Sequence, residues 1–271
     1  MPRLVPSGLG AAAVLFVLAT LIPLRSASGD SGPWREFYPT GEYVLFVGDQ
    51  LDENAVIHHS ERAAAYLVTS DRLERAVLIL PRTRCVEAIA ADEMEAREDG
   101  GIDIKKRAMP CSLGRFRIEG SNIIFRIGSE TASLRQKPPL EGGHLREGVL
   151  RHSPQYERQA DVYEPDPAMI EAIKRGGKQA RIQIFFGSWC SFCKRFIPYV
   201  LKVEEQLEDT ELSFEYFGLP APPAAWSSDM ATQMGIKKLP TGIIFIDDRE
   251  VGRVIGTEWV TPERALARIL Q

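Results

Sequence analysis

Hydrophobic residues change their spacing near residue 160, which predicts two structurally different parts of the chain. Before that point, short apolar or alternating runs are separated by turn-forming residues, as expected for β-strands. The candidate strands are 43–47, 64–69, 76–80, 85–90, 102–106, 116–119, 123–127 and 131–134. Gly120-Ser121 between two of these runs predicts a hairpin. We therefore expect a β-rich domain over residues 42–151, built as a small antiparallel barrel or sandwich. Residues 87–98 are rich in Ala and Glu, so a helix is the alternative prediction for that stretch.

After residue 166 the spacing becomes that of alternating strands and helices. Asp166 and Pro167 are typical of a helix start, and Gly176-Gly177 of its end. The following elements are expected as strand 181–186, helix 190–207, strand 212–217, helix 224–234, strands 242–246 and 251–256, and a last helix from Thr261. A strand–helix–strand crossover makes the first two strands parallel. Residues 166–271 are therefore predicted to form an α/β domain with a mixed sheet flanked by helices.

Two stretches have the composition of connections. Residues 29–41 are short, polar and rich in Gly, Ser and Pro, which predicts a linker. Residues 136–166 hold several prolines, a Gly pair and many charges, so we expect little core there and a connector over 152–165.

The first 28 residues have the layout of a targeting segment. Arg3 precedes an apolar run over 9–24, and Ser26-Ala27-Ser28 offers the small residues of a cleavage site. A cleaved signal peptide and an uncleaved membrane anchor both remain open, with a buried core helix as a third interpretation. Either of the first two predicts an extracytoplasmic protein, periplasmic or secreted, and the anchor would tether it to a membrane.

The composition restricts the class of protein further. The chain has 271 residues, 44% hydrophobic and 26% charged, which suits two globular domains with packed cores. Its net charge of −4 and the lack of a basic stripe argue against a nucleic-acid partner.

Cys190 and Cys193 carry the strongest chemical signal. They stand two residues apart at a predicted strand-to-helix junction, where free backbone N–H groups and the helix dipole stabilise a thiolate. A zinc site needs about four ligands, and the chain has no second Cys-x-x-Cys. The pair therefore indicates thiol–disulfide exchange, with a structural disulfide as the alternative, and nothing indicates a metal or a cofactor.

The run from Trp189 to Lys194, Pro198, the loop 235–241 and Gly256 together resemble the thioredoxin superfamily. The resemblance covers about 165–271 and implies a thioredoxin-like fold. It implies that Cys190 is the nucleophile, that Cys193 resolves the mixed disulfide, and that Pro240 is cis and lies against the disulfide. It also implies a hydrophobic groove for a substrate peptide. The groove residues would be Trp189, Phe192, Leu239 and Thr241.

Two positions depart from the family pattern. Ile184 stands where typical thioredoxins have a buried aspartate, and Ser191-Phe192 separates the cysteines in place of Gly-Pro. Extracytoplasmic thioredoxin-like reductases often replace that aspartate, which favours reduction of protein disulfides with electrons from a membrane donor. A disulfide oxidase or isomerase and a non-catalytic binding or assembly module on the same scaffold remain alternatives.

The remaining candidate residues lie outside this motif. Cys85 and Cys111 are expected to form a structural disulfide, with free thiols and a second redox pair as alternatives. His58 and His59 are adjacent and would point to opposite faces of a strand, so they would rarely share a metal ion. We expect solvated loop histidines there, and also at His144 and His152 in the charged connector. Lys194 either assists the Cys190 thiolate or belongs to a solvated helix face. Trp226 either borders the substrate groove or shapes its own loop.

Overall fold

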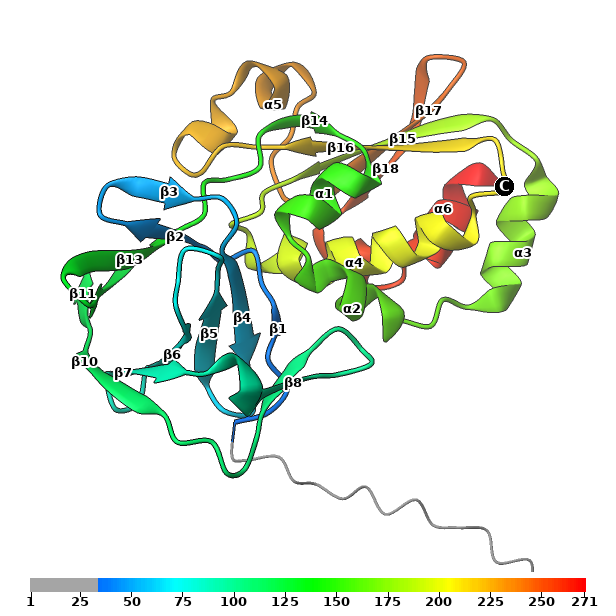
Figure 1. Cartoon of the computed structure of the whole chain (residues 1–271). Coiled ribbons are helices and arrows are strands. Elements are labelled where there is room, and N and C mark those ends of the chain that lie inside the picture. The colour runs from blue at the N-terminus through cyan, green and yellow to red at the C-terminus, as the bar shows by residue number, and fades with distance from the viewer. Residues whose placement is uncertain (1–33) are drawn as a thin grey trace, which may run out of the picture. The chain divides into compact units, whose positions relative to one another are not determined.

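The computed structural model describes residues 34–271 (Figure 1). The predicted signal peptide or anchor over 1–28 lies outside the described residues. Between residues 34 and 271, no helix has the length and hydropathy needed to cross a bilayer. The expected linker over 29–41 is wrong from residue 34 onward, because Phe37 is fully buried and Tyr38 pairs with His59 in a β-sheet.

Two antiparallel sheets form the β-rich part, as the spacing of the short runs predicts. The larger has the order β1-β4-β5-β6-β7-β10 and the smaller β11-β12-β13-β2-β3, while β8 pairs with β9 alone. Its strands are β1 (Tyr38–Pro39), β2 (Tyr43–Val47), β3 (Gln50–Asp52), β4 (Val56–Ser60), β5 (Ala65–Thr69), β6 (Ala76–Leu80), β7 (Cys85–Ile89), β8 (Met94–Ala96), β9 (Ile102–Ile104), β10 (Cys111–Arg115), β11 (Arg117–Glu119), β12 (Asn122–Ile127) and β13 (Glu130–Gln136). β11 and β12 form the expected hairpin around Gly120, whose φ of 61° suits glycine.

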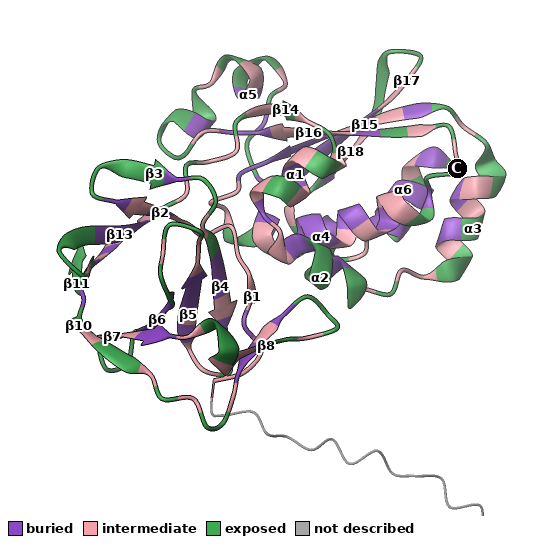
Figure 2. Ribbon diagram, in the orientation of Figure 1, coloured by how far each residue is buried: buried purple, intermediate pink, exposed green. Residues whose placement is uncertain are grey.

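The larger sheet is covered on both faces at its centre, whereas its edge strand β10 is mostly exposed (Figure 2). In β6, Val77 and Ile79 join the core shared with the smaller sheet, while Leu78 joins a second core on the opposite face. A strand covered on both faces has a continuous apolar sequence, as β6 does. The alternative helix over 87–98 is wrong because β7 belongs to this sheet, and the short 3₁₀ turn η1 (Ala91–Glu93) and then β8 follow it.

The C-terminal sheet has the order β14-β16-β15-β17-β18 and contains the predicted parallel pair, β15 and β16. Its strands are β14 (Gly142–His144), β15 (Ala180–Phe186), β16 (Leu212–Gly218), β17 (Thr241–Ile246) and β18 (Arg249–Ile255). The helices are α1 (Arg146–His152), α2 (Gln155–Asp161), α3 (Pro167–Gly176), α4 (Ser191–Gln206), η2 (Ala224–Trp226), α5 (Asp229–Gln233), η3 (Gly256–Val260) and α6 (Pro262–Leu270).

The helix expected over 224–234 is divided into η2 and α5, whereas the boundaries of α3 follow the sequence signals closely. The Asp166 carboxylate accepts a hydrogen bond from the Ala168 amide at 3.0 Å and so caps α3. Gly177 ends that helix in the left-handed conformation, with φ of 57°.

The expectation of little core over 136–166 is wrong. β14 pairs with β16 at the edge of the C-terminal sheet, and α1 and α2 follow it. Val149, Tyr156 and Ala160 from these helices are buried in the same core as β15 and α4. The prolines of this stretch lie outside its strands and helices, where they are compatible with regular structure. The boundaries predicted between the domains stay predictions.

Candidate active site

The two cysteines of the motif lie where β15 gives way to α4. Cys190 is the N-cap residue of α4, and its thiol is partly exposed. Cys193 lies in the first turn and is fully buried. The junction places one sulfur at the surface and the other one helical turn inside the core.

This environment makes the two thiols chemically different. The Cys193 side chain hydrogen-bonds to Cys190 and is the main cause that lowers the Cys190 pKa to about 6, from an ordinary value of 9.0. Partial burial opposes this effect, and the backbone amides of Cys193 and Phe192 add to it. Burial, and then Cys190, raise the pKa of Cys193 well above its ordinary value. At neutral pH the exposed sulfur is therefore a thiolate and the buried one a thiol.

The proline loop reaches the same end of the sheet. The Leu239–Pro240 peptide bond is cis, as the resemblance implies. Thr241 pairs with Phe185 near the end of β15, so Pro240 lies at the sheet end from which the Cys190 loop leaves. The Pro240 carbonyl accepts a hydrogen bond from the Gly256 amide at 2.7 Å, which ties the loop to the glycine after β18.

The expected substrate groove is only partly open. Leu239 and Thr241 are 6% and 2% exposed, so their side chains belong to the core and cannot line an accessible surface. Phe192 is 51% exposed and follows the nucleophile directly. The expected substrate-binding residues therefore differ in exposure: Leu239 and Thr241 are buried, and the exposed aromatic rings are the side chains that a partner can contact.

Trp189 and Trp226 extend this aromatic surface. Their rings meet edge to face with centroids 6.4 Å apart, and Trp226 is 45% exposed. The Trp189 indole N–H donates to the carbonyls of Leu219 and Pro220, at 3.2 and 2.9 Å, which fixes the ring. Trp226 thus borders the site, as one of the two sequence interpretations has it. We call Trp189, Phe192 and Trp226 the aromatic surface.

Lys194 forms a contact that the sequence did not reveal. Its ammonium group lies 3.2 Å from the Glu42 carboxylate, 152 residues away in the chain. No local pattern links two residues so far apart. A cleft of about 320 Å³ adjoins this ion pair and is lined by Glu42, Lys137, His152, Trp189 and Lys194, among others. Polar and charged side chains therefore flank the aromatic surface on one side.

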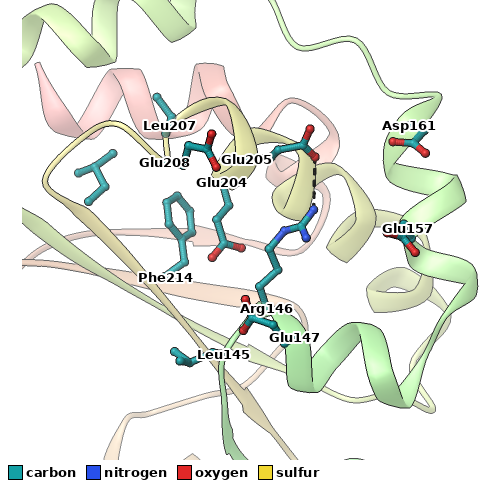
Figure 3. Close-up of a pocket in the computed structure, with 11 residues that line it drawn as sticks. Leu145, Arg146, Glu147, Glu157, Asp161, Glu204, Glu205, Leu207, Glu208 and Phe214 are labelled. Atoms are coloured by element: carbon teal, nitrogen blue, oxygen red, sulfur yellow. Dashed lines mark hydrogen bonds and ion pairs between the residues drawn. The ribbon is translucent and has the colours of Figure 1, made fainter.

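A larger cleft of about 670 Å³ lies elsewhere and contains no cysteine (Figure 3). The Arg146 guanidinium lies 3.3 Å from Glu205, as the dashed line in Figure 3 marks. Burial raises the pKa of Glu204 to about 7, although Tyr216 donates a hydrogen bond to its carboxylate at 2.6 Å. Within residues 34–271, no group of three or more His, Cys, Asp or Glu side chains has an arrangement suited to a metal ion.

The predicted disulfide between Cys85 and Cys111 is wrong. Both thiols are free, and the register of β7 against β10 places Cys85 opposite Arg115 and Cys111 opposite Ala88. The two cysteines are thus about three residues, or about 10 Å, out of register. A disulfide requires Cα atoms closer than about 7 Å.

The histidines differ from the expectation of solvated loops. His58 and His59 lie on β4 and point to opposite faces, but His58 is buried, and burial lowers its pKa. His144 and His152 each hydrogen-bond to a backbone carbonyl, of Glu141 and Pro138 respectively.

Comparisons with known proteins agree with this site. The chain is 30% identical over 96 residues to thioredoxin-2 of Saccharomyces cerevisiae, covering 35% of this chain and 85% of that protein. It is 32% identical over 84 residues to the mitochondrial thioredoxin-2 of Schizosaccharomyces pombe, which corresponds to 31% of this chain and 58% of that protein. Through this part, the chain belongs to the thioredoxin superfamily of thiol–disulfide oxidoreductases.

Other comparisons add little. No protein-family model matches the chain. A thioredoxin structure from Fasciola hepatica covers 36% of this chain and 88% of its own, with 18% identity and a TM-score of 0.27. The family assignment rests on the sequence relatives alone, and the β-rich part remains unassigned.

Proposed function

We propose that this protein is an extracytoplasmic thiol–disulfide oxidoreductase that reduces disulfides in other proteins. The observation that carries the proposal is the pairing of a partly exposed Cys190, with a pKa lowered to about 6, and a buried Cys193 whose pKa is raised. One sulfur is ready to attack while the other keeps its proton.

The geometry supports a two-step exchange. The Cys190 thiolate attacks one sulfur of a substrate disulfide, so a Cys190–substrate bond forms and the substrate disulfide breaks. The first substrate sulfur leaves as a thiolate. Cys193 then attacks Cys190, which releases the second substrate sulfur and leaves a Cys190–Cys193 disulfide. The substrate gains two electrons, and a dithiol donor must reduce the protein again.

The acidity of Cys190 favours reduction over oxidation. A very acidic nucleophilic thiol stabilises the reduced enzyme, so a protein whose nucleophilic cysteine has a pKa near 3.5 is a strong oxidant. In thioredoxin the pKa of that cysteine is near 7. A Cys190 pKa of about 6 is nearer to the second value. The protein is therefore proposed to deliver electrons, with the aromatic surface receiving the substrate peptide.

The proposed location and partners rest on the sequence. The apolar segment over 9–24 has signal-peptide or anchor features, which would place the site outside the cytosol. Electrons there would come from a donor in the membrane, and an uncleaved segment would tether the protein beside it. Fractionation of cells producing the full chain, with protease protection, tests this part; a cytosolic protein would refute it.

The reduction potential tests the reaction. The protein would be equilibrated in dithiothreitol or glutathione buffers, and Cys190 and Cys193 quantified by alkylation and peptide mass. A potential of about −270 mV supports a reductase, and one of about −120 mV would make the protein an oxidase. If this pair shows no reversible titration, the binding or assembly module is the better hypothesis. Cys190→Ser is the matched control.

A further inference from the structure

The buried thiol of Cys193 must lose its proton before it can attack Cys190. Its surroundings oppose this, because burial raises its pKa and the neighbouring Cys190 raises it further. The Gly187 amide donates a hydrogen bond to Cys193 Sγ at 3.5 Å. In the described part of the chain, no carboxylate is among the groups that act on the pKa of Cys193. Ile184 of the adjacent strand is fully buried and apolar.

Tyr156 is a polar side chain in this same core. It lies in the first turn of α2, is 1% exposed, and belongs to the apolar cluster that contains Cys193. Among residues 34–271 its hydroxyl makes no hydrogen bond of normal geometry, and only the Ser153 side chain acts on its pKa as a hydrogen-bonding group. A buried hydroxyl without a partner costs about 1–3 kcal/mol, so such a group calls for an explanation.

Contacts link the start of α2, where Tyr156 lies, to the first turn of α4. Gln155 accepts a hydrogen bond from the Gly41 amide at 2.9 Å. Glu42, the next residue, forms the ion pair with Lys194 at 3.2 Å. The start of α2 is therefore linked through two adjacent residues to the residue that follows Cys193.

The far end of α2 leads to the same arrangement. Tyr163, just beyond α2, stacks on Tyr199 of α4 with ring centroids 4.3 Å apart. Since the early residues of α2 lie by the start of α4 and the later ones by its middle, the two helices run side by side in the same direction. Tyr156 thus lies at the level of the turn that carries Cys193.

The electrostatics agree with this placement. Burial is the main cause that raises the pKa of Tyr156, and a charge on Cys193 is the next. Ser153 lowers this pKa, while Cys190 and Glu42 raise it. These four residues are the titratable or polar groups that act on the phenol, from the residue after α1, from the N-cap and first turn of α4, and from the segment before β2. The hydroxyl keeps its proton at any physiological pH.

We propose that the Tyr156 hydroxyl stabilises the thiolate of Cys193 and so assists the second step of the exchange. This inference rests on the proposed function. As Cys193 ionises, the phenol O–H points its dipole at the new charge, directly or through a bridging water. The Cys190–Cys193 bond forms while the Cys190–substrate bond breaks. The proton lost by Cys193 is taken up by the departing substrate thiolate, and the phenol ends the step unchanged.

The test follows the two steps separately. Reduced protein carrying Cys85→Ser and Cys111→Ser would be mixed with 5,5′-dithiobis(2-nitrobenzoate), and release of the yellow thiolate followed by stopped flow. The first equivalent reports attack by Cys190, and the second reports attack by Cys193. Tyr156→Phe keeps the ring and removes the hydroxyl. The second phase should slow by about tenfold at pH 7, as expected when a charge loses one hydrogen bond, with the first phase unchanged.

The pH dependence separates assistance from packing. The second-phase rates of wild type and Tyr156→Phe should converge at high pH, where Cys193 ionises unaided. Tyr163→Phe, which removes a hydroxyl bonded to Glu263, is the matched control and should leave both phases unchanged. Tyr156 replaced by 3-fluorotyrosine keeps a more acidic hydroxyl, and should speed the second phase even if the phenylalanine variant fails to fold.

Each outcome has a definite meaning. An unchanged second phase in Tyr156→Phe, or equal slowing of both phases, would overturn the role of Tyr156. Release of a single equivalent by the otherwise wild-type protein would instead overturn the exchange reaction itself.

Discussion

Replacing Cys193 by alanine should raise the pKa of Cys190, because the Cys193 side chain is the main cause of its low value. At pH 7 a thiol with a pKa of about 6 is about 90% ionised, whereas one at the ordinary 9.0 is about 1% ionised. The amides of Cys193 and Phe192 remain in the variant, so full recovery to 9.0 is the upper limit of the change.

Thiolate fraction alone overstates the effect on rate. Nucleophilicity falls with pKa with a Brønsted coefficient of about 0.4–0.5, so a thiolate three units more acidic is intrinsically roughly 20-fold slower. At pH 7 the wild type should therefore react about fourfold faster than a fully shifted variant, and at pH 5 about 40-fold faster. Above about pH 8 the order reverses, because the more basic thiolate of the variant is then sufficiently populated.

The assay is alkylation of Cys190 by iodoacetamide across pH 4–10, followed by peptide mass so that Cys85 and Cys111 do not contribute. Wild type should level off above about pH 7, and Cys193→Ala should continue to rise and cross it. Cys193→Ser retains a donor and should shift less. A midpoint that stays near 6 in Cys193→Ala would refute the assignment of Cys193 as the source of the acidity.

Three further outcomes follow from the packing and charges. Glu204→Gln should weaken the pH dependence of the free energy of unfolding. The folded pKa of about 7 lies above the ordinary 4.5, so wild-type stability falls by about 3 kcal/mol as pH rises between these two values. Urea unfolding at pH 5 and pH 8 should therefore differ less in the variant than in the wild type. Gly187→Ala would place a Cβ 2.6 Å from the Trp189 ring, so we expect a loss of about 1–3 kcal/mol and altered tryptophan emission; an unchanged spectrum would contradict this packing. Glu42→Gln should cost less than about 1 kcal/mol, because both partners are about 40% exposed, and 1 M salt should abolish the difference; a larger, salt-independent loss would show that the ion pair is not its cause.

Local chemistry explains why much of the fold could be predicted. The cap at Asp166, the hairpin at Gly120 and the paired cysteines each depend on residues within a few positions of one another. α2 was missed because prolines and charges surround it. Tyr156 and Ala160 nevertheless stand at i and i+4, which is the spacing of one face of a helix, and this is the signal that the sequence offers for α2.

The rest of the site depends on contacts distant in the sequence. Glu42 reaches Lys194 only after the β-strands between them have folded, and Tyr156 reaches the cysteine turn only through the packing of α2 on α4. The sequence also suggested a Cys85–Cys111 bridge, since an even number of cysteines is compatible with one. Strand register decided against it, and register is a property of the whole sheet.

The pairing of β14 with β16 affects where the chain can be truncated or fused to another protein. A truncated protein starting at residue 166, where the motifs begin, would expose the backbone edge of β16 over residues 216–218 and remove three buried side chains from the core. A bare strand recruits strands of other molecules, so this fragment is expected to aggregate. We therefore expect a stable C-terminal fragment to begin before residue 142, and fusions or domain exchanges should preserve everything from there onward.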